Sequence, residues 1–498
     1  GVRGAIAGGG AVRQGGPPSV LQLRRALAET LVRSRINVAD RLVILTAFVH
    51  DFRWETGVRS GSIAELWEEF WARGAPAGHF LECYAHFPFC RSRCLFCYTD
   101  SRVPSRWDVV QSYQEEWVRE MRDFAPLFSG RRFRMLNVGG GTPSLLSAEE
   151  LEACLEPLFS EFLFENDGMR SIEFNPASTT PNKLSVIRRL GFNRVSFGVQ
   201  SLDGAVLRSV RRERQDFEMG RSAVAAAKEL DLETNVDLVF GFMNETTESF
   251  LRGFRRLTTL RPTSISVSTL SLTDAYMRAM KVDRGQYLRH YERKLPETVE
   301  HLERLILETV YKPALFNPES NGEWIFVAEE VSEKIIPTLR LDNPAGELPN
   351  STLGLGRHSR SRVFGRGIYQ RTAEAFSRGN ECYRLALMTM KEEMALYIIA
   401  VLEDCSRVEF ARFSRRFGVD AREKFSWELR ALEVLCKIRM DEEGFSFLPV
   451  RLPERILYAS FFLTDTLARS PHSRSLLNDS LIVRLRRELE PRWVAARG

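Results

Sequence analysis

The chain has 498 residues, of which 44% are hydrophobic and 27% charged, a composition typical of a globular protein with one large domain and one or two smaller ones. The formal net charge of +5 is small for this length, and basic and acidic residues are interspersed, which argues against nucleic-acid and membrane-surface partners. No apolar run of about 18 residues and no charged-then-apolar leader stands out. We therefore expect a cytoplasmic protein with a small-molecule partner.

The first segments along the chain predict a tail followed by helices. Residues 1–18 are rich in glycine and predict a flexible tail. Residues 19–79 carry apolar side chains at helical spacing, as in Val20, Leu27 and Leu31, which predicts an N-terminal helical layer.

Residues 80–275 alternate between short strands and helices. The predicted strands are Glu82–Phe87, Arg134–Val138, Ser171–Phe174, Arg194–Phe197, Thr234–Phe240 and Ser264–Leu270. The predicted helices are Trp107–Phe124, Ala148–Phe159, Pro181–Leu190, Phe217–Leu230 and Thr247–Leu257. Repeated strand–helix units build a parallel sheet, so the expected fold class is α/β, a partial (β/α)6 barrel with its chemistry at the carboxyl ends of the strands.

The remaining chain divides into two predicted parts. Residues 276–385 show no clean period and predict a connecting region. Residues 386–498 predict helices at 391–402, 409–417 and 422–435, a hairpin at Ile438–Leu448, and helices at 453–467 and 475–490. Three helices and a hairpin are typical of a winged-helix domain, but the third helix is balanced in charge, so no DNA role is expected.

The eight cysteines are unevenly spread, and four of them lie close together. Cys83, Cys90, Cys94 and Cys97 form this group, whereas the other four are scattered among apolar residues and are expected to pack in the core. In a reducing cytosol, clustered cysteines indicate a metal site rather than disulfides.

Three of these cysteines follow the first barrel strand with the spacing CxxxCxxC, in Tyr84-Ala-His-Phe-Pro-Phe-Cys90-Arg-Ser-Arg-Cys94-Leu-Phe-Cys97. Three thiolates on one loop can bind three irons of a 4Fe-4S cluster and leave the fourth iron open. If the open iron binds the amino and carboxylate groups of S-adenosylmethionine, one electron breaks a carbon–sulfur bond and gives a 5'-deoxyadenosyl radical.

Two alternatives compete for these cysteines. Cys94 and Cys97 could form half of a zinc site, but no second CxxC or HxxxH lies at zinc-finger spacing. Cys83 could close the cluster as a fourth ligand. Its side chain should face away from that of its strand neighbour Tyr84, so a core cysteine is favoured.

A glycine-rich turn and four polar residues extend the predicted site. Asn137-Val-Gly-Gly-Gly-Thr-Pro143 follows the second strand, and its glycines allow the backbone to approach the amino group of S-adenosylmethionine. Glu173 and Gln200 end the next two strands, Arg212 follows, and Asp237 lies in the fifth strand. Carboxylates and amides suit ribose hydroxyls, and an arginine suits the methionine carboxylate.

Four segments together resemble the oxygen-independent coproporphyrinogen III oxidase-like family of radical S-adenosylmethionine enzymes: residues 84–97, 139–144, 190–201 and 235–242. The resemblance spans residues 80–270, with a weaker likeness through the C-terminal domain. It implies that Cys90, Cys94 and Cys97 bind the cluster. It also implies that the S-adenosylmethionine site is lined by Tyr84, Phe96, Gly140, Gly141, Thr142, Glu173, Gln200, Arg212 and Asp237.

The resemblance further implies one or two bound S-adenosylmethionine molecules, a reductant such as flavodoxin or ferredoxin, and a substrate covered by the connecting region and the C-terminal domain. Two departures matter. Coproporphyrinogen oxidases in this family carry a further cysteine where this chain has Thr99, and the haem-chaperone branch carries a His-Asn-x-x-Tyr-Trp pattern that Leu348–His358 lacks.

The interpretation that remains is the class C radical methyltransferase and cyclopropanase branch. In it, a one-carbon unit moves from a second S-adenosylmethionine to an sp2 carbon of a natural-product or aromatic substrate. The alternatives are radical oxidation or decarboxylation of a small molecule, and haem carriage. The sequence singles out no catalytic side chain.

Overall fold

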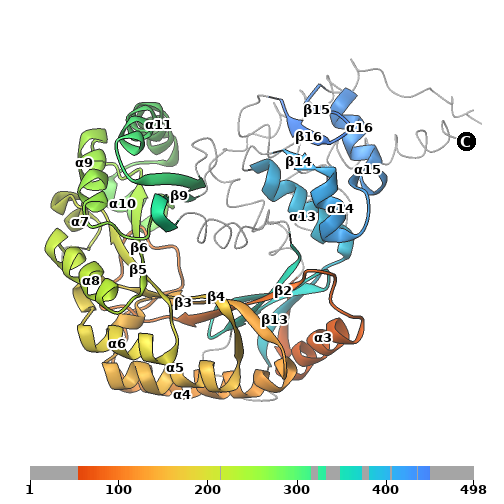
Figure 1. Ribbon diagram of the computed structural model, residues 1–498, viewed down its shortest axis with the longest axis horizontal. Helices are drawn as coiled ribbons and strands as arrows, with labels where there is room; N and C mark the ends of the chain where they lie inside the picture. The colour runs from red at the N-terminus through yellow and green to blue at the C-terminus, as the bar shows by residue number, and fades with distance from the viewer. Residues whose placement is uncertain are drawn as a thin grey trace, which may run out of the picture.

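One large, curved sheet organises the described part of the chain (Figure 1). The computed structural model describes residues 54–212, 215–315, 323–331, 348–372, 381–403, 407–434, 436–448 and 462. Within these residues the sheet has 13 strands. Its central run is parallel and consists of β2 (Phe80–Phe87), β3 (Arg132–Gly140), β4 (Leu163–Phe174), β5 (Arg194–Gln200), β6 (Glu233–Phe240) and β7 (Ser264–Thr269).

Helices connect these strands and cover the outer face of the sheet (Figure 1). They are α4 (Trp107–Phe124), α5 (Ala148–Glu161), α6 (Pro181–Leu190), α7 (Gly204–Ser209), α8 (Phe217–Glu229) and α9 (Thr247–Thr258). Short 3-10 turns add η1 (Ala125–Phe128), η2 (Pro143–Leu145) and η3 (Pro176–Ser178). The alternation confirms the predicted α/β class. None of the described helices is long and apolar enough to cross a membrane.

Local sequence signals explain why the barrel helices begin and end where they do. The α6 helix starts at Pro181, whose missing N–H suits a first helical position, after Thr180 as N-cap. It ends at Gly191, whose φ of 116° is the left-handed conformation of a helix C-cap. The α4 helix buries residues at helical spacing, among them Val110, Trp117 and Met121, against the sheet. Each such side chain contributes about 1.5–3 kcal/mol by leaving water.

Residues 276–385 differ from the expectation of a connecting region, because they supply six further strands of the same sheet. These are β8 (Tyr311–Leu315), β9 (Glu323–Ala328), β10 (Asn350–Leu355), β11 (Arg360–Val363), β12 (Gly367–Arg371) and β13 (Glu381–Leu387). The β10 strand pairs in parallel with β2, and β9 pairs antiparallel with β7. The same stretch contains α11 (Arg284–Leu307), which follows α10 (Asp274–Met280), and the turn η4 (Glu329–Val331).

The N-terminal segment also departs from the predicted helical layer. A strand, β1 (Glu55–Arg59), precedes the helix α3 (Ser60–Ala72) and pairs antiparallel with β13. A partner more than 300 residues away, rather than local periodicity, makes Glu55–Arg59 extended. The predicted tail at residues 1–18 and helices at residues 19–53 lie outside the described residues.

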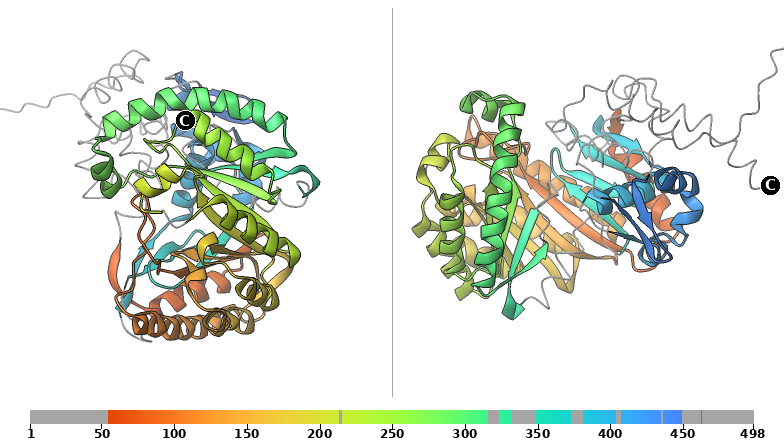
Figure 2. Two further views of the ribbon diagram at one scale, coloured as in Figure 1. Left: turned by 90° about the vertical axis from the view of Figure 1, so that its left-hand side faces the viewer. Right: turned by 90° about the horizontal axis from the view of Figure 1, so that it is seen from above.

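The C-terminal part contains helices and a small separate sheet, at the opposite end of the large sheet from α9 and α11 (Figure 2). The helices are α13 (Met390–Glu403), α14 (Phe410–Phe417), α15 (Ala421–Lys424) and α16 (Ser426–Val434). The hairpin β15 (Ile438–Met440) and β16 (Gly444–Phe447) is confirmed, and β14 (Val408–Glu409) pairs with β16. The predicted third helix is interrupted at Phe425. The winged-helix assignment and the domain boundaries stay predictions, and the predicted helices 453–467 and 475–490 fall beyond the described residues, apart from residue 462.

Candidate functional site

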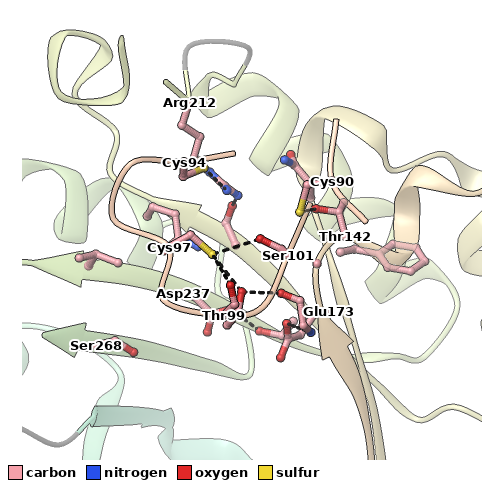
Figure 3. A pocket seen from close by; sticks show the side chains of 18 of the residues that line it. Cys90, Cys94, Cys97, Thr99, Ser101, Thr142, Glu173, Arg212, Asp237 and Ser268 are labelled. Carbon is pink, nitrogen blue, oxygen red and sulfur yellow. Dashed lines mark hydrogen bonds between the residues drawn. The ribbon is translucent and has the colours of Figure 1, made fainter. Parts of the chain in front are cut away.

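The carboxyl ends of the parallel strands surround a cavity of about 1070 Å³. Figure 3 shows the thiols of Cys90, Cys94 and Cys97 around this pocket, together with Glu173 and Asp237. All three cysteines are free and partly exposed. The fold therefore brings the predicted cysteine loop and both predicted carboxylates to one cavity.

Contacts on both sides fix the cysteine loop, which we define as residues 88–102. At one side, Cys90 N–H donates to Arg102 O at 3.0 Å. At the other, Leu95 N–H donates to Val210 O at 3.1 Å, and the Thr273 hydroxyl donates to Leu95 O. The Cys90–Arg102 bond closes the loop on itself, and the bonds to Val210 and Thr273 connect it to the segments after β5 and β7, so the thiols face the cavity from a restrained backbone.

Each thiol of the loop lies beside a polar group. The Thr142 hydroxyl donates to Cys90 Sγ at 3.3 Å, and Arg212 Nη1 donates to Cys94 Sγ at 3.6 Å. Cys97 Sγ lies 2.9 Å from Thr99 Oγ1. Burial raises the pKa of the Cys90 thiol, and the Thr142 hydrogen bond opposes that rise. The donors on Thr142 and Arg212 favour the thiolate forms of Cys90 and Cys94, and the thiolate is the form that binds iron.

The donor set fits a cluster better than a single ion. Across the described residues, no three His, Cys, Asp or Glu side chains converge closely enough to bind one metal ion. A 4Fe-4S cluster takes each thiolate on a different iron, so ligands around its corners stand apart. Cys83 is 2% exposed within the hydrophobic core and does not line the cavity, which confirms the prediction of a core cysteine.

The glycine-rich turn brings β3, β4 and the cysteine loop close together. A β-carbon on Gly139 would lie 2.4 Å from Glu173 Cδ, and one on Gly140 would lie 2.3 Å from His86 Cε1. Gly140 also has a φ of 103°, and its carbonyl accepts from the Thr99 hydroxyl at 3.0 Å. Only glycine fits these contacts. The turn is thus required for packing, and Gly140, Gly141 and Thr142 line the cavity as predicted.

The two predicted carboxylates are held in a polar but poorly solvated environment. Burial, with Asp237 as the next cause, raises the pKa of Glu173 to about 7, and Glu173 accepts from Gly140 N–H at 3.4 Å. Burial also raises the pKa of Asp237, which accepts from the Ser196 hydroxyl and from Asn235 Nδ2, both at 2.6 Å. Each carboxylate faces the cavity and can accept further hydrogen bonds from a ligand.

Gln200 and Arg212 come from the end of β5 and the segment after α7. Gln200 has a φ of 71°, and its side chain lies against Gly198, where a β-carbon would be 2.8 Å from Gln200 Nε2. Arg212 donates to Gly198 O and, through Nε, to Gln215 Oε1 at 3.3 Å. Arg212 is therefore fixed between β5 and Cys94, with its guanidinium at the cavity wall.

The two predicted aromatic residues lie differently. Phe96 lines the cavity and packs edge-to-face on Phe242, with ring centroids 5.4 Å apart. Tyr84 is absent from the cavity lining, contrary to expectation, because its hydroxyl turns to His86 Nδ1 at 3.0 Å.

Sequence reasoning missed a polar network inside the barrel. Asn235 Nδ2 donates to Ser196 Oγ at 2.8 Å, and the Ser266 hydroxyl donates to Asn235 Oδ1 at 3.2 Å. Arg194 Nη2 donates to Ser264 Oγ at 2.6 Å. The available signal was an alternation of polar and apolar residues along β6 and β7 with the polar side inward, the reverse of the usual arrangement.

Comparison with known proteins identifies the class. Residues 84–257 match the model of the Radical SAM superfamily, so this part of the chain is a radical SAM domain. Such a domain implies a 4Fe-4S cluster and S-adenosylmethionine, and the cysteine loop and cavity fit both. The predicted second S-adenosylmethionine stays a prediction.

Individual relatives narrow the class. The chain is 28% identical to the oxygen-independent coproporphyrinogen III oxidase of Salmonella typhimurium over 378 residues, which are 73% of this chain and 81% of the relative. It is 30% identical to the heme chaperone HemW of Mycobacterium tuberculosis over 207 residues, 41% of this chain and 53% of that protein. The structure of coproporphyrinogen III oxidase (HemN) from Escherichia coli superposes on this chain with a TM-score of 0.64 and 22% sequence identity. The superposition covers 83% of this chain and 94% of that one, so the two proteins share a fold.

These relatives change which of the functions considered from the sequence is favoured. Their names agree better with the alternatives, radical oxidation of a small molecule or haem binding, than with one-carbon transfer. Membership of the class C methyltransferase branch is not supported by them.

Proposed function

We propose that this protein is a radical S-adenosylmethionine enzyme that oxidises or decarboxylates a small molecule. The observation that carries the proposal is the convergence of Cys90, Cys94 and Cys97 on one cavity with Glu173 and Asp237. A haem carrier does not need carboxylates held at raised pKa beside a thiol loop, whereas a bound nucleoside uses hydrogen-bond acceptors of this kind.

The cofactors and the protein have separate tasks. When bound, a reduced 4Fe-4S cluster would supply one electron to S-adenosylmethionine, giving methionine and a 5'-deoxyadenosyl radical that takes a hydrogen atom from the substrate. The substrate radical would then lose a proton or carbon dioxide and pass one electron to an external one-electron acceptor. The chain's own part is to bind and orient. Cys90, Cys94 and Cys97 would hold the cluster, and Arg212, fixed beside Cys94, would pair with the methionine carboxylate.

The remaining cavity residues would orient the nucleoside. Glu173 and Asp237 offer acceptor oxygens to ribose hydroxyls, and Gly140 and Gly141 leave room for the amino group. Phe96 supplies an apolar wall for adenine. The cavity of about 1070 Å³ is slightly larger than the usual range of ligand pockets, about 300–1,000 Å³. It therefore has room for a substrate beside S-adenosylmethionine.

We propose a class of reaction and not a single substrate because this chain has Thr99 at a position where the coproporphyrinogen oxidases differ. In the coproporphyrinogen oxidases a cysteine stands at this position. Here the Thr99 hydroxyl connects Cys97 to Gly140 O and so joins the cysteine loop to the glycine-rich turn. The relatives make coproporphyrinogen III the first substrate to test, and Thr99 makes other small molecules with an activated C–H bond the next.

The test is product analysis with the anaerobic, cluster-loaded protein, dithionite and S-adenosylmethionine. We expect 5'-deoxyadenosine and methionine, with 5'-deoxyadenosine formed in step with oxidised substrate and without S-adenosylhomocysteine. If S-adenosylhomocysteine accumulates together with a methylated product, one-carbon transfer is the reaction instead. If the loaded protein forms no 5'-deoxyadenosine at all, the proposal is wrong.

A further inference from the structure

Two side-chain hydroxyls of the cysteine loop itself lie next to the Cys97 thiol (Figure 3). Thr99 Oγ1 is 2.9 Å from Cys97 Sγ, and Ser101 Oγ is 3.6 Å from it. The polar groups beside Cys90 and Cys94 lie at 3.3 and 3.6 Å. Among these printed contacts, the hydroxyl of Thr99 is therefore the one nearest to a thiol. The inference that follows rests on the proposed function, because it concerns a cluster bound at this loop.

The backbone holds both hydroxyls in place. Ser101 N–H donates to Thr99 O at 2.8 Å, which closes a tight turn directly after Cys97. Arg102 N–H donates to Pro88 O at 2.7 Å and joins the end of the loop to its beginning. Ser101 is 3% exposed. The hydroxyls thus contact Cys97 from a restrained turn and not from freely moving surface side chains.

The Thr99 hydroxyl has one hydrogen and two neighbours that can accept it, Cys97 Sγ and Gly140 O, the latter at 3.0 Å. A protonated Cys97 can donate its own hydrogen to Thr99, which leaves the hydroxyl hydrogen for Gly140 O. An iron-bound Cys97 is a thiolate without a hydrogen, so only the hydroxyl can donate across the 2.9 Å contact. Because a charged acceptor makes the stronger hydrogen bond, we expect the hydroxyl hydrogen to rotate toward the sulfur.

A hydrogen bond to a ligand sulfur affects the two redox states of a cluster unequally. Reduction adds one negative charge, part of which lies on the sulfurs, so a hydroxyl donor stabilises the reduced state more than the oxidised state. Hydrogen bonds to the sulfurs are among the factors that set the reduction potential of a 4Fe-4S cluster. Each hydroxyl beside Cys97 therefore makes the cluster easier to reduce.

We propose that Thr99 and Ser101 are positioning residues that donate hydrogen bonds to the Cys97 thiolate and thereby raise the reduction potential of the cluster. Thr99 has the larger share, because its hydroxyl lies closer to the sulfur. In the coproporphyrinogen oxidases the position of Thr99 carries a cysteine, and a thiol is a weaker hydrogen-bond donor than a hydroxyl. Thr99 thus gives this chain its own means of adjusting the cluster.

The test is a redox titration of the full-length, cluster-loaded protein, followed by the electron paramagnetic resonance signal of the reduced cluster in the absence of S-adenosylmethionine. Thr99→Val removes the hydroxyl and keeps the shape, Thr99→Ser keeps the hydroxyl, and Ser101→Ala removes the second donor. The matched control is Thr298→Val, which removes a buried hydroxyl on α11 that lies 3.2 Å from Thr247 Oγ1 and does not line the cavity. Iron and sulfide content is measured for every variant.

Thr99→Val should lower the ratio of reduced to oxidised cluster about tenfold at a fixed potential near the midpoint. For one electron this corresponds to a midpoint about 59 mV more negative than that of the wild type. Ser101→Ala should shift the midpoint in the same direction by a smaller amount. Thr99→Ser and the control should have the midpoint of the wild type, and all variants should keep the full iron and sulfide content.

Other results would overturn the proposal. If Thr99→Val holds the full cluster at an unchanged or more positive potential, Thr99 only connects the cysteine loop to the glycine-rich turn. If Thr99→Val assembles no cluster, Ser101→Ala decides, and an unchanged potential in that variant sinks the proposal. A wild type that assembles no cluster would refute the proposed function first and this inference with it. The expected shifts without any 5'-deoxyadenosine formation would refute the proposed function alone.

Discussion

Two groups of charged residues lie on opposite sides of the barrel sheet and differ in how they are compensated. Inside, Glu173 and Asp237 face the cavity with raised pKa values, and within the described residues no ion pair joins either carboxylate to a cationic side chain, although Arg194 and Arg212 lie near enough to Asp237 to oppose the rise in its pKa. Outside, between α4 and β12, Arg371 pairs with Glu120 at 2.9 Å and with Glu116 at 3.0 Å, and the Arg371 and Glu120 side chains are 0% exposed.

The outer group is a closed structural network. Glu120 also accepts from the Tyr383 hydroxyl at 2.8 Å and from Gly356 N–H at 2.7 Å, so its oxygens are used within the fold. The inner group keeps acceptor capacity open toward a cavity. The difference teaches that burial alone does not identify a functional charge. A buried carboxylate that is not closed into an ion pair and that faces a cavity is the better indicator.

The largest effect is expected when one cysteine ligand of the cluster is removed from the inner site. Cys94→Ala should abolish the iron–sulfur absorbance or the cleavage of S-adenosylmethionine, because two thiolates cannot hold the cluster in its place. Cys83→Ala is the control, since Cys83 is buried away from the cavity. It should retain both properties. If Cys94→Ala assembled the full cluster and cleaved S-adenosylmethionine, the assignment of the cysteine loop as the cluster site would be wrong.

The next effect concerns the outer network. Arg371→Met leaves Glu116 and Glu120 without their cation in a dry environment and should lower the free energy of unfolding by about 3–5 kcal/mol. Arg122→Met is the matched control on the same helix. Its partner, Glu161, lies 3.5 Å away, and the Arg122 side chain is 64% exposed, so its loss should cost about 1 kcal/mol or less. Equal denaturant midpoints for the two variants would contradict the comparison.

A smaller effect is expected on the affinity for S-adenosylmethionine, without loss of the cluster. Arg212→Ala should weaken S-adenosylmethionine binding by about 1.5–3 kcal/mol, the usual range for a charged hydrogen bond, with the cluster retained. Calorimetric titration of the loaded protein measures it. Arg221→Ala removes the same charge from an exposed position on α8, where Arg221 pairs with Glu218, and should leave the affinity unchanged. An unchanged affinity in Arg212→Ala would place the methionine carboxylate elsewhere.

The smallest effect is the pH dependence of Glu173. Burial raises its pKa from 4.5 to about 7, so the folded chain keeps a proton that the unfolded chain has released between these values. The free energy of unfolding of the wild type should therefore fall, relative to Glu173→Gln, as pH rises from 4.5 to about 7. Denaturant titrations on either side of this window measure the difference. Parallel pH profiles for the two proteins would show that Glu173 titrates normally.

Prediction from the sequence succeeded where structure is determined locally. The Pro181–Leu190 helix was placed correctly because its cap, proline and glycine are adjacent in the chain. The strands β10 to β13 and β1 were missed, because their extended form depends on partners far away, such as Phe80 for Asn350. The cavity residues could be predicted from motifs at strand ends. The inward serines and Asn235 could not, because no single one of them forms a motif.

The antiparallel pairing of β7 with β9 has a consequence for how such a protein can diversify. The glycine contacts at Gly139 and Gly140 fix the spacing between the cysteine loop and β4, so that side of the cavity tolerates little change. Glu323 and Ile325 enter the cavity from β9, a strand outside the repeated strand–helix units. Substitutions on β9 can therefore alter which molecule is recognised while radical generation is inherited intact, which separates the evolution of selectivity from that of reactivity.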